Sequence, residues 1–282
     1  MKRLGLLATL VVVSSFCALP TAFGQSGSVE FVARVTPSSG IEEPIRGFPF
    51  YLLRRSFQQI AKEAEAGEAK PDMNAFIDKL EVSKELKEWM KKNHSVTLQG
   101  QDFIHLLKPA DVMGVREFYN AYMSRNAGDE SYNFPKPKYT MQDKEKHPAK
   151  YDKLKADYDA AVQRYMTDHP ESIDGMDLNL TDLDPSKKWK DLEANRQQKV
   201  RQQALGLAQS KYLVARAETD LDGRAWLRGI QPGNYWLTNL ELAANVGDAR
   251  LRWDIAVTVP AGGTASVALT NGNAIPPALA SP

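Results

Sequence analysis

The segment AETDLDGRAWLRGIQPGNYWL, residues 217–237, contains two turn sequences and two strand patterns. Gly223 ends the first turn and supplies the positive φ that tight turns need. Pro232 and Gly233 form the second turn, in which proline fixes φ at the leading position. Ala225 and Leu227, and then Tyr235 and Leu237, alternate with polar or bulky residues at the period of two that is typical of strands. The segment therefore predicts a β-hairpin.

The same residues resemble the signature of carboxypeptidase regulatory-like domains. The resemblance lies in Thr219-Asp220-x-x-Gly223, Ala225-x-Leu227-x-x-Ile230 and Pro232-Gly233-x-Tyr235-x-Leu237, and it extends to residues 44–48 and 257–264. It implies a β-sandwich of the immunoglobulin or transthyretin type, grouped with carbohydrate-binding-like folds, with about seven strands. Because a fold does not fix a function, the resemblance leaves the activity to be argued from a site.

A long helical segment interrupts this pattern. The resemblance covers residues 28–53 and 212–270, so the sandwich is assigned to residues 25–53 and 212–270, whereas residues 54–211 carry apolar side chains at helical spacing. Ser56, Ser83 and Asp184 are expected N-caps, and a long helix is expected from Pro148 to Pro170. The predicted fold class is α+β: a seven-stranded sandwich with an all-α insertion between its second and third strands. Residues 271–282, small and proline-rich, are expected to be a disordered tail.

Residues 1–24 have the composition of an export signal. Lys2 and Arg3 precede an apolar run, and the small residues Ala22 and Gly24 fit a cleavage site before Gln25. Cleavage there leaves 282 − 24 = 258 residues without cysteine, and 36 − 2 = 34 basic against 35 acidic residues. This near-neutral charge does not indicate nucleic-acid binding, and no membrane span is expected after cleavage. The absence of disulfides favours the bacterial periplasm or exterior.

No catalytic motif or metal-ligand spacing is found in the sequence. The four histidines, at positions 94, 105, 147 and 169, lie in four different contexts, and His105 is expected in the core. The acidic residues from Asp168 to Asp184 suit either a solvated loop or a calcium site, but their order does not match an EF-hand. We therefore expect no catalytic residue, metal or cofactor.

Four residues stand out as a candidate binding surface. If Ala225, Leu227, Tyr235 and Leu237 face the core, the period of two places the alternate side chains on one outer sheet face: Arg224, Trp226, Arg228 and Trp236. Exposed aromatic rings of this kind mark contacts. Docking of the helical insertion is the favoured interpretation, since burying each ring gains about 2 kcal/mol; stacking on a glycan is the alternative. Trp253 is expected in the core.

These observations predict a non-catalytic, exported protein of the cell envelope that acts as a binding or scaffolding module. Its sharpest form has the four residues contacting a glycan or an envelope protein. Two alternatives remain open. One is an envelope hydrolase with its site in the helical insertion, and the other is a structural subunit of an envelope assembly.

Overall fold

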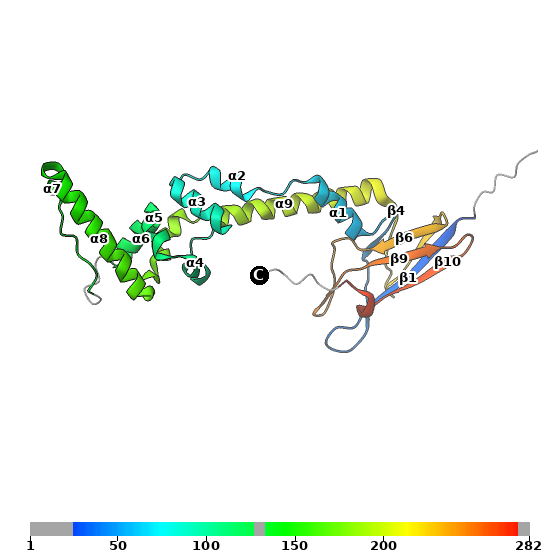
Figure 1. Cartoon of the computed structure of the whole chain (residues 1–282). Coiled ribbons are helices and arrows are strands. Elements are labelled where there is room, and N and C mark those ends of the chain that lie inside the picture. The colour runs from blue at the N-terminus through cyan, green and yellow to red at the C-terminus, as the bar shows by residue number, and fades with distance from the viewer. Residues whose placement is uncertain (1–24, 127–132, 276–282) are drawn as a thin grey trace, which may run out of the picture. The chain divides into compact units, whose positions relative to one another are not determined.

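The computed structural model describes residues 25–126 and 133–275 (Figure 1). The predicted signal peptide and residues 276–282 lie outside the described residues. The fold is α+β, with about 49% helix and 22% strand. Residues 64–203 form one compact unit, here the helical unit, and the described residues on either side of it form the other, here the sheet unit. This division falls within the predicted insertion, residues 54–211, rather than at its ends.

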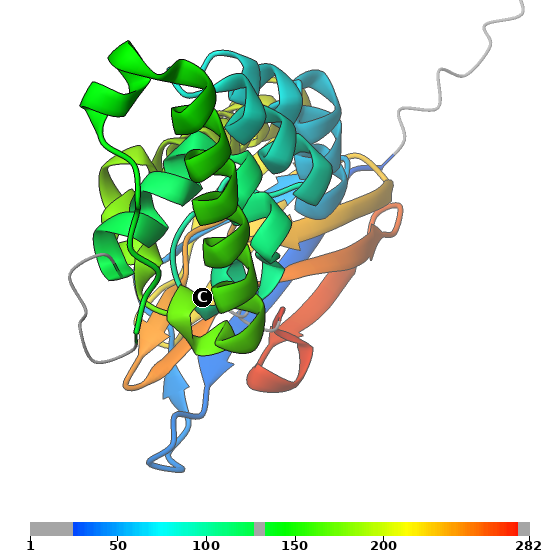
Figure 2. The ribbon, with the colours of Figure 1, turned by 60° about the vertical axis from the view of Figure 1, so that its left-hand side comes forward.

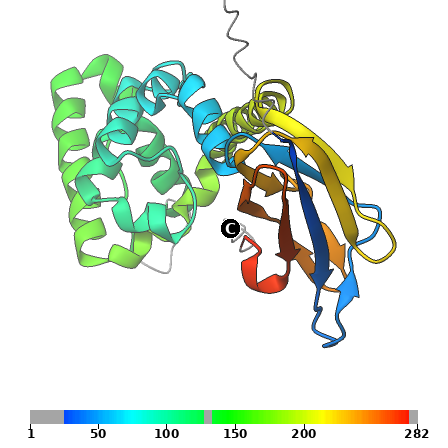
Figure 3. The same cartoon turned by 90° about the vertical axis from the view of Figure 1, so that its right-hand side faces the viewer.

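The first sheet of the sheet unit is built around β1 (Gly27–Val35). This strand pairs in parallel with β10 (Thr264–Leu269) and antiparallel with β5 (Arg224–Ile230) and the short β2 (Glu43–Pro44). Figure 3 shows β1, in blue, beside β10, in dark red. The central strand of this sheet, β1, thus pairs with an edge strand that lies more than 200 residues later in the sequence.

The second sheet is antiparallel, with its strands in the order β4 (Leu213–Glu218), β3 (Pro49–Leu53), β6 (Gly233–Thr238) and β9 (Asp254–Val259). A two-stranded ribbon is formed by β7 (Ala244–Val246) and β8 (Ala249–Leu251). The described residues therefore contain ten strands rather than seven, of which β2, β7 and β8 have only two or three residues. The predicted disorder is wrong for residues 271–275, because Asn271–Asn273 form a short 3-10 helix (η5) and Ile275 bridges to Arg252.

The predicted hairpin at residues 217–237 is wrong in its pairing. β5 pairs with β1 in the first sheet, whereas β4 and β6 both lie in the second. The two turns therefore carry the chain from one sheet to the other and back. Gly223 does take the expected positive φ, +77°, but in a crossing between sheets.

The alternation of side chains agrees with the sequence. Ala225, Leu227, Tyr235 and Leu237 are buried, and Trp253 is fully buried, as predicted. They belong to one core to which both sheets contribute. Its least exposed members are Val29, Ala33, Val35, Phe50, Leu52, Leu237, Ala244, Trp253 and Leu269.

The insertion leaves the sheet unit between two paired strands, since Leu53 of β3 lies opposite Leu213 of β4. Helix α1 (Phe57–Gly67) follows β3, and its first turn is capped from two sides. The Ser56 hydroxyl accepts from the Gln59 amide, and Asp254 of β9 accepts from the Gln58 amide. Burial raises the pKa of Asp254 despite these amide contacts. Helix α9 (Ser186–Leu207) returns to the sheets through a π-helical turn, η4 (Ala208–Tyr212).

The helical unit contains the remaining helices, among which α8 is the long green helix in Figure 2. They are α2 (Met73–Asp78), α3 (Lys84–Asn93), α4 (Gln101–Leu106), α5 (Pro109–Gly114), α6 (Arg116–Asn126), α7 (Met141–Lys146) and α8 (Pro148–Asp168), with the 3-10 helices η2 (Pro170–Ile173) and η3 (Met176–Leu183). The unit has its own apolar core, in which Trp89, Phe103 and Phe118 meet edge to face.

The caps inferred from the sequence operate in this unit. Ser83 accepts from the Leu86 amide at the start of α3, and Asp184 accepts from the Ser186 amide at the start of α9. Ser83 also donates through its hydroxyl and its amide to the buried carboxylate of Glu117. Burial opposes ionisation of Glu117, but the bonds from Ser83 outweigh it and lower the pKa.

Among the helices of the described residues, none combines the length and the apolarity needed to span a bilayer.

Candidate functional site

The outer face of the first sheet gathers three of the four predicted site residues. Cross-strand pairing places side chains from β5, β1 and β10 in three rows, which together we call the β5–β1–β10 face: Arg228, Ser28 and Thr264; Trp226, Glu30 and Ser266; Arg224, Val32 and Ala268. Side chains at directly opposed positions of a sheet are near neighbours on the same face. The face therefore combines one large ring with hydroxyl, carboxylate and guanidinium groups.

Trp226 points away from the core because its neighbours along β5 point into it. Ala225 and Leu227 are each 3% exposed, whereas Trp226 is 43% exposed. Arg224 and Arg228, two residues before and after it, are also exposed. An indole of this exposure is unusual, because burial of its apolar area would be favourable. The ring lies in the middle row of the face, between the two arginines.

A shallow depression lies on this face; Trp226 does not line it, but its lining includes Glu30, which is opposite Trp226 on β1, and Arg224, two residues before Trp226 on β5. The depression has a volume of about 310 Å³, and its lining also includes Val32, Ser266 and Ala268. Val32 and Ala268 contribute small apolar groups, and the other three contribute polar ones. Volumes of about 300 Å³ and above are typical of sites for small ligands.

The polar groups of the face differ in whether they already form ion pairs or hydrogen bonds with one another. Arg224 lies 3.8 Å from the carboxylate of Glu30, measured from Nη1 to Oε1. The hydroxyls of Ser28 and Thr264 are hydrogen-bonded to each other at 2.7 Å. Arg228 forms no ion pair within residues 25–126 and 133–275.

Trp236 does not share this face, so the predicted group of four residues is wrong in one member. It lies on β6 of the second sheet, opposite Leu53 of β3 and Ala256 of β9, and it is partly buried. The period of two correctly turned both tryptophans away from the core. It could not show that β5 and β6 belong to different sheets. Docking of the helical insertion onto these rings concerns both units and stays a prediction.

Glu30, Ser266 and the hydroxyl pair of Ser28 and Thr264 were not predicted from the sequence as members of this face. Ser28 and Glu30 lie almost 200 positions before Trp226 in the sequence, and Thr264 and Ser266 lie on β10, which does not pair with β5. They share a face with Trp226 only because β1 pairs with both β5 and β10. The available signal was the polar half of each alternating strand, such as Ser28 and Glu30 between Gly27, Val29 and Phe31.

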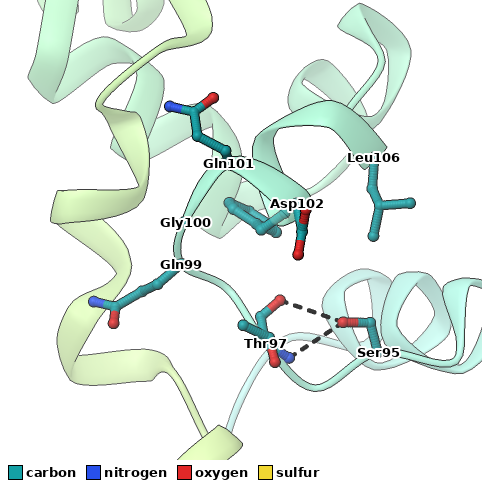
Figure 4. Close-up of a pocket in the computed structure, with 8 residues that line it drawn as sticks. Ser95, Thr97, Gln99, Gly100, Gln101, Asp102 and Leu106 are labelled. Atoms are coloured by element: carbon teal, nitrogen blue, oxygen red, sulfur yellow. Dashed lines mark hydrogen bonds between the residues drawn. The ribbon is translucent and has the colours of Figure 1, made fainter. Parts of the chain in front are cut away.

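The helical unit contains a second pocket, also of about 310 Å³ (Figure 4). Its lining is mostly polar: Ser95, Thr97, Gln99, Gly100, Gln101, Asp102, Phe103 and Leu106. In Figure 4 the Ser95 hydroxyl bonds to the backbone of Thr97, and the Gln99 amide points toward η3, where it donates to Thr181. Of these lining residues one, Asp102, carries a carboxylate, and none is a histidine.

Two further expectations concern possible catalytic or metal sites. The prediction that His105 is a core residue is wrong, since its side chain is exposed in the last turn of α4, on the solvent side of the buried Phe103 and Ile104. The acidic segment from 168 to 184 contains η2 and η3. Asp177 of η3 accepts from the Gly100 amide, and Asp184, the residue after η3, accepts from the Leu98 amide. Within the described ranges no three side chains of His, Cys, Asp or Glu come together as a metal site.

Comparisons with known proteins give no family. No family model matches the chain, and no curated protein matches it. One similar solved structure, from Pseudomonas aeruginosa, is of a protein proposed to bind carbohydrate; it has 11% identity and a TM-score of 0.24, over 88% of this chain and 90% of that one. A second is a pilus backbone protein from Streptococcus pneumoniae, with 16% identity and a TM-score of 0.19, over 81% of this chain and 34% of the other. Likeness at these scores does not establish a shared fold.

Proposed function

We propose that the protein is a non-catalytic binding module of the cell envelope, and that the β5–β1–β10 face binds a glycan. The observation that carries this proposal is the 43% exposed ring of Trp226, set between two arginines on the same face as a depression of about 310 Å³. The proposal also takes the two sheets as the β-sandwich that the family resemblance implies.

The chemistry of the face suits a sugar. A pyranose ring presents a face of C–H groups, which packs against an indole, and a rim of hydroxyls, which need hydrogen-bond partners. Glu30 supplies an acceptor, Arg224 supplies donors, and Ser266 supplies both, all within the lining of one depression. One apolar platform with a few placed polar groups is typical of sites for small ligands.

Replacing Trp226 with alanine is expected to weaken glycan binding about tenfold or more. The stacked ring loses its platform, and a loss of about 1.4 kcal/mol corresponds to a factor of ten. The purified protein would be screened on a printed array of bacterial and plant oligosaccharides, and each ligand found would be titrated by calorimetry against the wild type and the variant.

Trp236→Ala provides the matched control, because that ring lies on the other sheet. It should leave the dissociation constant unchanged. Binding that survives Trp226→Ala, or that is lost equally in Trp236→Ala, would contradict the assignment of the face. Failure to bind any glycan would turn the search to a protein partner for the same face.

The cell-envelope part of the proposal depends on export. Expression of the full chain in a Gram-negative host should give a periplasmic product whose first residue is Gln25, as determined by N-terminal sequencing. Ala22→Trp should block this processing, since the cleavage site requires a small residue at that position. A product that keeps Met1 and remains in the cytoplasm would refute export.

A further inference from the structure

The charges on the β5–β1–β10 face are unevenly compensated. The guanidinium of Arg224 has Glu30 within 3.8 Å. Directly across the sheet from Arg228 lies the neutral Ser28, and Thr264 lies next along the row; Glu30, on the diagonal, pairs with Arg224 instead. The hydroxyls of those two residues are bonded to each other. Arg228 is exposed and forms no ion pair in the part of the chain that the structure describes.

An uncompensated guanidinium beside a stacking ring selects for charge in the ligand. Arginine presents a planar fork of donors that matches the two oxygens of a carboxylate, and such charge-assisted bonds are stronger than neutral ones. A neutral sugar would offer this group only hydroxyls. The face therefore has one cationic position that a neutral glycan leaves without a counter-charge.

We propose that the ligand is an acidic saccharide, in which a sugar ring stacks on Trp226 and a ring carboxylate pairs with Arg228. This inference rests on the proposed function and adds the ligand's chemical class to it. Trp226 and Arg228 are two residues apart on one face of β5, so their Cα atoms are separated by about 6.8 Å. A carboxylate on the stacked ring or on the next ring lies within reach of an arginine side chain at that spacing. Arg224 and Glu30 are then left to form hydrogen bonds with the sugar hydroxyls at the depression.

The test compares acidic oligosaccharides with their own methyl esters, which keep the ring and remove the charge. Oligogalacturonates and alginate oligosaccharides would each be titrated in both forms. We expect the acids to bind about threefold to tenfold more tightly than the esters at low salt, and the difference to shrink as salt is added. Arg228→Gln should abolish the preference, so that the variant binds the acid and the ester with equal affinity.

The controls separate this inference from the proposed function. Trp226→Ala should weaken both forms. Arg216→Gln, on β4 of the second sheet, removes an exposed arginine of equal charge and should leave the preference intact. Equal binding of acid and ester that still depends on Trp226 would overturn the acidic ligand and keep the glycan-binding face. An acid preference that survives Arg228→Gln would also overturn it. Binding of neither form would overturn the acidic ligand, and glycan binding that ignores Trp226 would overturn both proposals.

Discussion

Trp253→Ala is expected to lower the free energy of unfolding of the sheet unit by about 3–5 kcal/mol. The side chain is fully buried, and its ring centroid lies 6.0 Å from that of Phe50 on β3, whereas Trp253 itself directly precedes β9. The indole Nε1 donates to the Thr270 carbonyl at 3.0 Å. Truncation would therefore open a large cavity and remove the indole bond to this carbonyl, which would keep only the 3.4 Å bond from the Asn273 amide. Urea titrations, combined with hydrogen exchange of β3 and β9, would measure the loss in this unit.

Trp226→Ala is the matched control for this prediction. It removes the same side chain from an exposed position of the same unit, and such surface changes usually cost little. A loss below about 1 kcal/mol is expected. If the two variants were destabilised equally, Trp253 would not be the centre of the core, and Trp226 would not be free to bind a ligand.

Gly223→Ala is expected to cost about 2 kcal/mol or more, because two effects add at this crossing between the sheets. The residue has φ of +77°, where an L-residue pays about 1–2 kcal/mol. A Cβ atom here would also lie 2.5 Å from the carbonyl oxygen of Ala33 and 3.1 Å from the Cβ of Pro44. The Gly223 carbonyl accepts from the Ala33 amide at 2.8 Å, so moving the turn would break this bond between strands.

Gly229→Ala separates the two effects. Gly229 lies on β5 with φ of +70°, and a Cβ there would meet nothing within 4 Å. This variant should lose only the conformational part, about 1–2 kcal/mol, and the difference between the two urea midpoints measures the steric part. Equal destabilisation would mean that the close approach of Gly223 to β1 and Pro44 contributes nothing.

The candidate site could be predicted from the sequence only in part. Alternation along β5 correctly placed Arg224, Trp226 and Arg228 outward, because side-chain direction in a strand follows from the backbone of that strand alone. The same argument placed Trp236 with them, and there it was wrong. Glu30 and Ser266 were not foreseen, because they reach Trp226 through strand pairs that join distant parts of the chain.

The sequence by itself determined the features that depend on near neighbours. These are the helix caps at Ser83 and Asp184, the inward and outward sides of each strand, the burial of Trp253 and the positive φ of Gly223. Only the tertiary structure decided that β5 joins β1 and that β6 joins β3 and β9. Turn sequences fix a reversal of the chain, whereas the choice of sheet depends on which arrangement buries both apolar faces in one core. Because of that choice, Trp226 lies at the centre of an exposed polar face of the first sheet, whereas Trp236 lies on the second sheet.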